Sequence, residues 1–151
     1  MIKNKFNLVA AALCLAFAGP VLAADSAISK DEVKAEKDRI KQETKANKDK
    51  CKDMKGNAKD ICTAEAKGQE KVAKAELEMK MKDTPKNKYD VAAAKADADY
   101  NVAKEKCDDM KGKEKDACQK DAKAARDSAK KTAKSERESA EPKKGKAKKD
   151  A

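Results

Sequence analysis

A pair of cysteines separated by ten residues occurs twice in this chain, and it constrains the fold more than any other feature. The first copy runs from Cys51 to Cys62 and the second from Cys107 to Cys118. Both copies place Met-Lys-Gly and then Lys-Asp between the cysteines. A motif repeated at a fixed period indicates one supersecondary unit used twice. We interpret each unit as an antiparallel helical hairpin clamped by a disulfide between its own two cysteines.

Gly56 and Gly112 occupy the same place in the two copies, where a left-handed residue after a helix end is expected. They are therefore the predicted turn residues. In an alternative interpretation each glycine only interrupts a longer helix. The two cysteines of a unit would then lie about 16 Å apart along the axis and would cross-link separate chains. A zinc site built from all four cysteines fits less well, because such sites usually space their cysteine pairs by two to four residues.

Residues 1–23 have the pattern of a secretory signal peptide. Lys3 and Lys5 form a positive start, an apolar run covers residues 8–18, and Val21-Leu-Ala23 fits a cleavage site. The pattern predicts export to the periplasm and, after cleavage, no membrane-spanning segment. Cleavage would also remove Cys14, which leaves an even number of cysteines in a compartment where disulfides persist.

The composition limits both the core and the chemistry. Charged residues make up 44% of the chain and aromatic residues 3%, and Trp and His are absent. Such a chain forms either long thin helices with a narrow apolar stripe or a mostly disordered polyampholyte, and the scarcity of Gly and Pro favours helices. Without His or a nucleophile–base pair, we expect no catalytic residues, no metal site, no cofactor and no enzyme. The exported location and the lack of stacking aromatics disfavour nucleic-acid binding.

The first unit shows helix signals on both sides of its glycine. Ser29 and Glu32 form a capping box, and Asn57 is placed to cap the second helix. The expected apolar stripe of the first helix is Val33, Ile40, Asn47 and Met54, with Cys51. That of the second helix is Ala58, Ile61, Gly68, Val72, Ala75 and Met79. If the cysteines face each other, Ile40 should oppose Ala73 and Asn47 should oppose Ala66.

The second unit has the more regular stripe. Thr84 and Pro85 start its first helix. The expected stripe of that helix is Tyr89, Ala93, Ala96, Tyr100, Ala103, Cys107 and Met110, and that of the last helix is Cys118, Ala122, Ala125, Ala129 and Thr132. Pairing through the cysteines should place Ala103 opposite Ala122, Tyr100 opposite Ala125 and Ala96 opposite Ala129.

These signals divide the chain into four parts. We expect a signal peptide at 1–23, one hairpin at 28–83, a second hairpin at 84–141 and a basic, disordered tail at 142–151. The tail lysines are candidate anion-binding residues, namely Lys143, Lys144, Lys146, Lys148 and Lys149.

The second unit carries a resemblance to known exported proteins. Ala103-Lys-Glu-Lys-Cys107, Gly112 and Cys118-Gln-Lys-Asp-Ala-Lys123 are similar to the pattern of small, exported, TolA-like proteobacterial proteins rich in Ala and Lys. We expect neither the membrane anchor nor the globular C-terminal domain of TolA itself in this chain. Its composition also resembles that of the desiccation-protective late-embryogenesis proteins. The first resemblance implies a helical, exported protein of the cell envelope, and the second implies a helical protein with a protective role.

The sequence therefore predicts an all-α protein of two disulfide-clamped, coiled-coil-like hairpins that pack together or form a homo-oligomer. The expected function is a non-enzymatic periplasmic role, structural or protective against envelope stress, exerted through charged helical surfaces. The alternative is a module that binds anionic envelope components, such as lipopolysaccharide or phospholipid headgroups, through lysine-rich faces and the tail.

Overall fold

The computed structural model describes residues 28–141, which form four α-helices and no strands within that range. The helices are α1 (Lys30–Lys50), α2 (Gly56–Met81), α3 (Pro85–Cys107) and α4 (Gly112–Ala140). The all-α prediction with two hairpins is confirmed. The predicted signal peptide and the basic tail, with its candidate lysines, lie outside the described residues.

Local capping explains where two of the helices begin. The Glu32 amide donates to Ser29 Oγ at 3.2 Å, and the Ser29 amide donates to Glu32 Oε2 at 2.8 Å, which completes the capping box. The backbone hydrogen bond from Ser29 lowers the pKa of Glu32. Thr84 Oγ1 accepts from the Asn87 amide at 3.1 Å, and Pro85 is the first residue of α3. These starts agree with the sequence signals.

The turns use the two predicted glycines. Gly56 has φ +57° and Gly112 has φ +54°, a conformation that L side chains rarely adopt. Each glycine is the first residue of the helix after the turn, and α1 and α3 end several residues earlier, at Lys50 and Cys107. Asn57 does not cap α2, because its side-chain amide donates to the Glu105 carbonyl oxygen of α3 at 2.7 Å. That cap prediction was wrong.

Each hairpin is closed by its own disulfide, as predicted. Cys51 bonds to Cys62 with a Cα–Cα distance of 5.6 Å, and Cys107 bonds to Cys118 with a Cα–Cα distance of 5.7 Å. Cys51 and Cys107 are buried. Closing a loop of this length contributes about 3 kcal/mol in the loop-entropy model, a large contribution for a protein with few bulky apolar residues.

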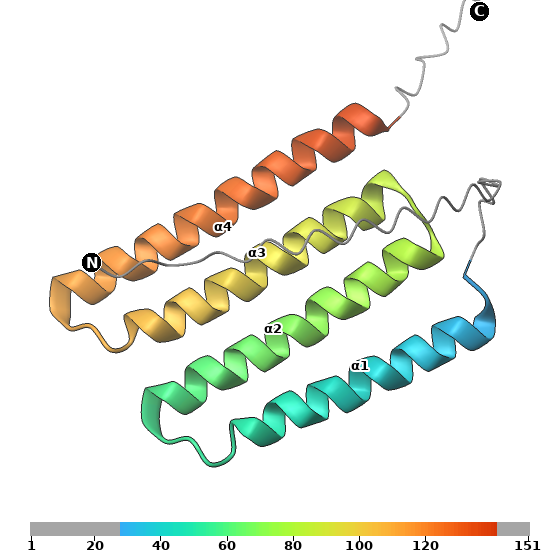
Figure 1. The fold of residues 1–151 in the computed structure, drawn as a ribbon. Helices are drawn as coiled ribbons and strands as arrows, with labels where there is room; N and C mark the ends of the chain where they lie inside the picture. Colours follow the sequence, from blue (N-terminus) through green and yellow to red (C-terminus); the bar gives the residue numbers. More distant parts are fainter. Residues whose placement is uncertain (1–27, 142–151) are drawn as a thin grey trace, which may run out of the picture.

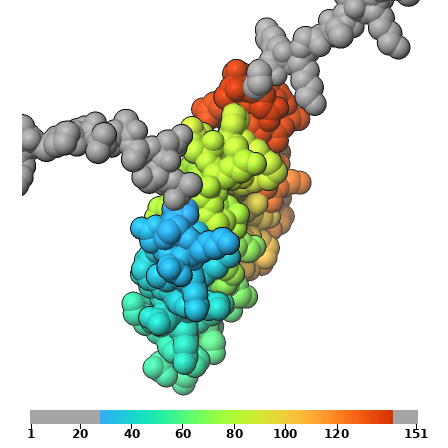
Figure 2. Space-filling model, turned by 90° about the vertical axis from the view of Figure 1, so that its right-hand side faces the viewer, coloured from blue at the N-terminus to red at the C-terminus, as the bar shows by residue number. Residues whose placement is uncertain are grey.

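The four helices form a single layer rather than a bundle. Among the described residues, each helix contacts only its neighbours in the chain: α1 with α2, α2 with α3, and α3 with α4. Figure 1 shows the helices lying side by side in chain order, and Figure 2 shows the same molecule turned, as a narrow slab. No described helix therefore covers either broad face of the layer.

The two hairpins join through a close approach of α2 and α3. Gly68 is buried, and a Cβ built on it would lie 2.7 Å from Ala98 Cβ. Glu76 pairs with Lys95 across the same contact at 2.9 Å. This interface also explains why Val91 is buried although the expected stripe of α3 omitted it: α3 has neighbours on two sides.

The second hairpin packs with a different face of α4 from the one predicted. Ala125, Ala129 and Thr132 are exposed, so the predicted pairs of Tyr100 with Ala125 and of Ala96 with Ala129 were wrong. The Arg126 guanidinium lies over the Tyr100 ring at 4.4 Å from its centroid instead. Such cation–π contacts add to the area that the long arginine stem covers.

Further along the same hairpin, the Arg137 guanidinium lies 5.1 Å from the centroid of the Tyr89 ring. Lys130 Nζ contacts both carboxylate oxygens of Asp97 at 2.7 Å, and Ala133 is buried. Predicting Met110 within the α3 stripe was also wrong, since it is exposed in the turn after α3.

The first hairpin has a thinner apolar contact. Ile40 and Ala66 are buried, and Ile40, Asn47, Ala66 and Ala73 line one small cavity between α1 and α2, as the expected pairing requires. Asn47 Nδ2 donates to Gln69 Oε1 at 2.8 Å. Met54 and Ala58, two members of the expected stripes, are exposed.

No helix among residues 28–141 is both long and apolar enough to cross a membrane.

Candidate functional site

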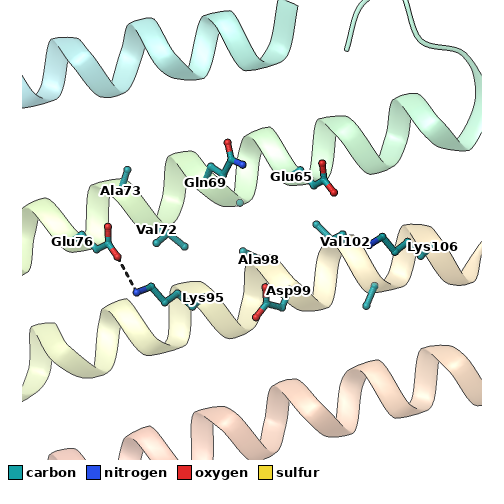
Figure 3. Close-up of a pocket in the computed structure, with 12 residues that line it drawn as sticks. Glu65, Gln69, Val72, Ala73, Glu76, Lys95, Ala98, Asp99, Val102 and Lys106 are labelled. Carbon is teal, nitrogen blue, oxygen red and sulfur yellow. Dashed lines mark ion pairs between the residues drawn. The ribbon is translucent and has the colours of Figure 1, made fainter. Parts of the chain in front are cut away.

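A groove with a volume of about 710 Å³ lies between α2 and α3. Val72, Ala98 and Val102 line it between the helices, and the Glu76–Lys95 ion pair crosses it (Figure 3). Its lining contains no hydroxyl, thiol or imidazole group. Within residues 28–141 no cluster of His, Cys, Asp and Glu is arranged to hold a metal ion. The polar groups of the groove are carboxylates, lysines and one amide.

A more distinctive feature is a stripe of lysines along one side of α1. The stripe begins at Lys30 and continues in steps of three and four residues to Lys48. Residues at these spacings lie above one another on one face of a helix. All of its members are exposed except Lys48, which is half-buried.

The lysine side of α1 continues onto α2. Lys37 and Lys41 line a groove of about 270 Å³ together with Lys74 of α2, and the buried Ile40 and Leu77 line the same groove. Lys67 and Lys71 precede Lys74 by seven and three residues, so they share its side of α2. We call this surface the lysine face. It comprises Lys30, Lys34, Lys37, Lys41, Lys45 and Lys48 of α1 and Lys67, Lys71 and Lys74 of α2.

On the α3 side the lysine face borders a second groove, of about 320 Å³. Lys67 and Lys71 line this groove with Lys104 and Asn101 of α3. Its other polar groups include Asp60 and Glu105. The positive surface thus extends across the layer from α1 to the edge of α3.

Three carboxylates border the nine lysines of the lysine face. Glu78 lines the groove with Lys37 and Lys74, and Asp60 lines the groove with Lys67. The third is Glu70. Glu70 accepts from Lys74 Nζ at 2.6 Å and from Lys48 Nζ at 2.9 Å. The hydrogen bond from Lys74, followed by that from Lys48, lowers the pKa of Glu70 to about 2, so this carboxylate is charged at neutral pH. Within the described residues, Lys34, Lys37, Lys45, Lys67 and Lys71 take part in no ion pair, which leaves their charges available to a ligand.

The opposite face of the same hairpin is acidic. Glu43 lines a small cavity with Gln69 and Ala73, and these two residues also line the large groove that holds Glu65 and Glu76. By helix periodicity, Glu65, Gln69 and Glu76 lie on the side of α2 opposite Lys74. We call this surface the glutamate face, and it comprises Glu32, Glu36, Glu43, Glu65 and Glu76.

On the glutamate face the basic residues are largely engaged in ion pairs. Arg39 contacts both Glu36 and Glu43, and Lys80 lies 3.5 Å from Glu36. The hydrogen bond from Arg39 is the main reason why the pKa of Glu36 falls to about 2. Both sides of α1 are charged, but most of its lysines without an ion pair lie on the lysine side, Lys50 being the exception.

Folding thus separates charges that alternate along the sequence. The regular spacing of lysines from Lys30 to Lys48 is the feature of the sequence from which the lysine side of α1 could have been predicted. The predicted residues, namely the disulfide cysteines and the turn glycines, hold the hairpins together but lie at their ends and present no ligand-binding groups.

Comparisons with protein-family models, with curated proteins and with solved structures found no match for this chain.

Proposed function

We propose that this chain is a non-enzymatic periplasmic protein that acts in the cell envelope through a charged helical surface, and that the lysine face is this surface. It would bind the phosphate groups of anionic envelope lipids. The observation that supports the proposal is the arrangement of lysines without ion pairs on one flat side of α1 and α2, where lysines outnumber the carboxylates Asp60, Glu70 and Glu78.

The strength of such binding follows from electrostatics. Each lysine near an anionic surface contributes about 1 kcal/mol, and at about 0.15 M salt the attraction reaches only about 8 Å. A flat layer brings many lysines within that distance at once, whereas a rounded bundle would present only a few. The disulfide between Cys51 and Cys62 holds α1 against α2, so less ordering entropy is lost on binding.

The compartment is supported by three features of the chain. Disulfides are typical of extracytoplasmic proteins, and each unit of this chain contains one. The signal-peptide pattern of residues 1–23 and the resemblance to small TolA-like exported proteins both favour the periplasm. A structural or stress-protective role would follow if the protein covers lipid phosphates and thereby reinforces the envelope surface.

Binding to vesicles tests the proposal. The mature protein should co-sediment with vesicles containing anionic phospholipid and not with neutral vesicles, and added salt should weaken the binding. Changing Lys34, Lys37, Lys41 and Lys71 to Gln removes about 4 kcal/mol at low salt, or about a thousandfold in affinity.

A matched control carries the same change in net charge elsewhere. Lys50, Lys88, Lys106 and Lys111 are exposed and lie outside the lysine face, and their change to Gln should leave most of the binding intact. Equal losses in the two variants would show that only net charge matters. The absence of binding by the unmodified protein would refute the proposal.

A further inference from the structure

The internal repeat relates the two outer edges of the layer to the contact at its centre. α1 and α4 are the edge helices, and each has a neighbour on one side only. In the repeat α1 corresponds to α3 and α2 corresponds to α4. The outer edge of α4 is therefore equivalent to the side of α2 that packs on α3. Likewise, the outer edge of α1 is equivalent to the side of α3 that packs on α2.

The central contact shows what such a pairing needs. Gly68 and Ala98 are small enough for the α2 and α3 backbones to approach closely. Polar links lie on either side, from Glu76 to Lys95 and from Asn57 to the Glu105 carbonyl oxygen. The two helices thus join through small residues with polar cross-links.

The outer edges have small residues and opposite charges. At the positions equivalent to the central contact, α4 exposes small and basic residues, namely Lys113, Ala117, Lys120, Ala124, Ser128, Lys131 and Ser135. The equivalent side of α1 carries small and acidic residues, namely Asp31, Ala35, Asp38, Gln42, Ala46 and Asp49. All are exposed except Asp49, which is half-buried.

We propose that the outer edge of α4 in one copy packs antiparallel against the outer edge of α1 in a second copy, so that the layer continues from molecule to molecule. In the register of the central contact, Ala124 and Gln42 take the places of Gly68 and Ala98. Lys120 then lies near Asp49, and Lys131 lies near Asp38. Because Gln42 is larger than Ala98, these helices lie farther apart and the longer charged side chains make the contact.

This pairing has two consequences. The two edges are different surfaces, so the contact is heterologous and does not end at a dimer. Continuation of the layer also leaves both broad faces uncovered, so the lysine face stays accessible. Self-association goes beyond the proposed lipid binding, and it can be measured in the absence of lipid.

Sedimentation velocity of the mature protein over a concentration series at low salt tests the pairing. The mean mass should rise with concentration past that of a dimer without a plateau, and added salt should reverse the rise. The variant Lys120→Glu/Lys131→Glu has two acidic edges, and Asp38→Lys/Asp49→Lys has two basic edges. Each alone should need at least about tenfold higher concentration to associate.

An equimolar mixture of the two variants restores complementary edges at every contact, so it should associate at least as well as the unmodified protein. Circular dichroism verifies that each variant is helical, and Lys120→Gln/Lys131→Gln replaces the Glu variant if that one unfolds. A monomer at all concentrations, a plateau at the dimer, or a mixture that associates no better than its components would overturn the proposal.

Discussion

Replacing Gly68 by Ala is predicted to destabilise the protein, although alanine is the better helix former. In the interior of an exposed helix this change would stabilise by about 1 kcal/mol. Here the added Cβ would lie 2.7 Å from Ala98 Cβ and 3.3 Å from Ala98 Cα. These atoms cannot turn away, so α2 and α3 must separate, and overpacking of this kind costs about 1–3 kcal/mol. We expect a net loss of about 1 kcal/mol, measured by urea unfolding followed by helical circular dichroism.

Two further variants isolate the cause. Ala124 occupies the equivalent, exposed position of α4, and Ala124→Gly should lose about 1 kcal/mol from helix propensity alone. Adding Ala98→Gly to Gly68→Ala removes the Cβ–Cβ clash, so the double variant should be more stable than the sum of the two single effects predicts. A Gly68→Ala variant that is about 1 kcal/mol more stable than the unmodified protein would refute the close contact between the hairpins.

Three more predictions follow from the hairpins and the tail. Changing Cys51 and Cys62 to Ala should lower the free energy of unfolding by about 3 kcal/mol, and peptide mapping of the unmodified protein under non-reducing conditions should find no link between the two repeats. Glu70→Gln should destabilise the protein at neutral pH and make no difference near pH 2. The lowered pKa of Glu70, about 2 against an ordinary 4.5, gives stability that is present above pH 4.5 and is lost as the pH falls toward 2; an equal effect at both pH values would contradict the role of the ion pairs. Deleting residues 142–151 should weaken vesicle binding less than the substitutions on the lysine face, and abolition of binding by the deletion alone would place the binding site in the tail instead.

Local signals in the sequence were sufficient to predict the two hairpins. The Ser29 capping box, Pro85 and the two turn glycines act through residues that are neighbours in the chain, so their effect does not depend on the rest of the fold. The disulfide pairing follows from the repeat for the same reason: each pair of cysteines belongs to one turn.

The apolar stripes alone could not predict which side of each helix packs against its neighbours. The expected stripe of α4 contained Ala125 and not Arg126, whereas in the structure Ala125 is exposed and Arg126 is half-buried over Tyr100. Alanine gains little from burial, whereas the arginine stem and guanidinium cover the ring of Tyr100. A single stripe per helix also could not predict that Gly68 and Ala98 join the hairpins, because α2 and α3 each bury two sides.

The candidate site was partly visible in the sequence. The spacing of Lys34, Lys37 and Lys41 already places them on one side of a helix. Whether these lysines form one surface with Lys74 of α2, and on which side Glu43 lies, depends on how α1 packs on α2. The sequence alone does not show this packing. The order of charges along the chain therefore does not show that the lysines of α1 and α2 form one surface.

Lysine footprinting tests the lysine face most directly. The mature protein is acetylated with and without vesicles containing anionic phospholipid, and the modification of each lysine is measured by mass spectrometry. The account predicts that Lys34, Lys37, Lys41 and Lys71 become protected while Lys106 keeps its reactivity. Uniform protection of all five lysines, or protection confined to the tail at 142–151, would contradict it.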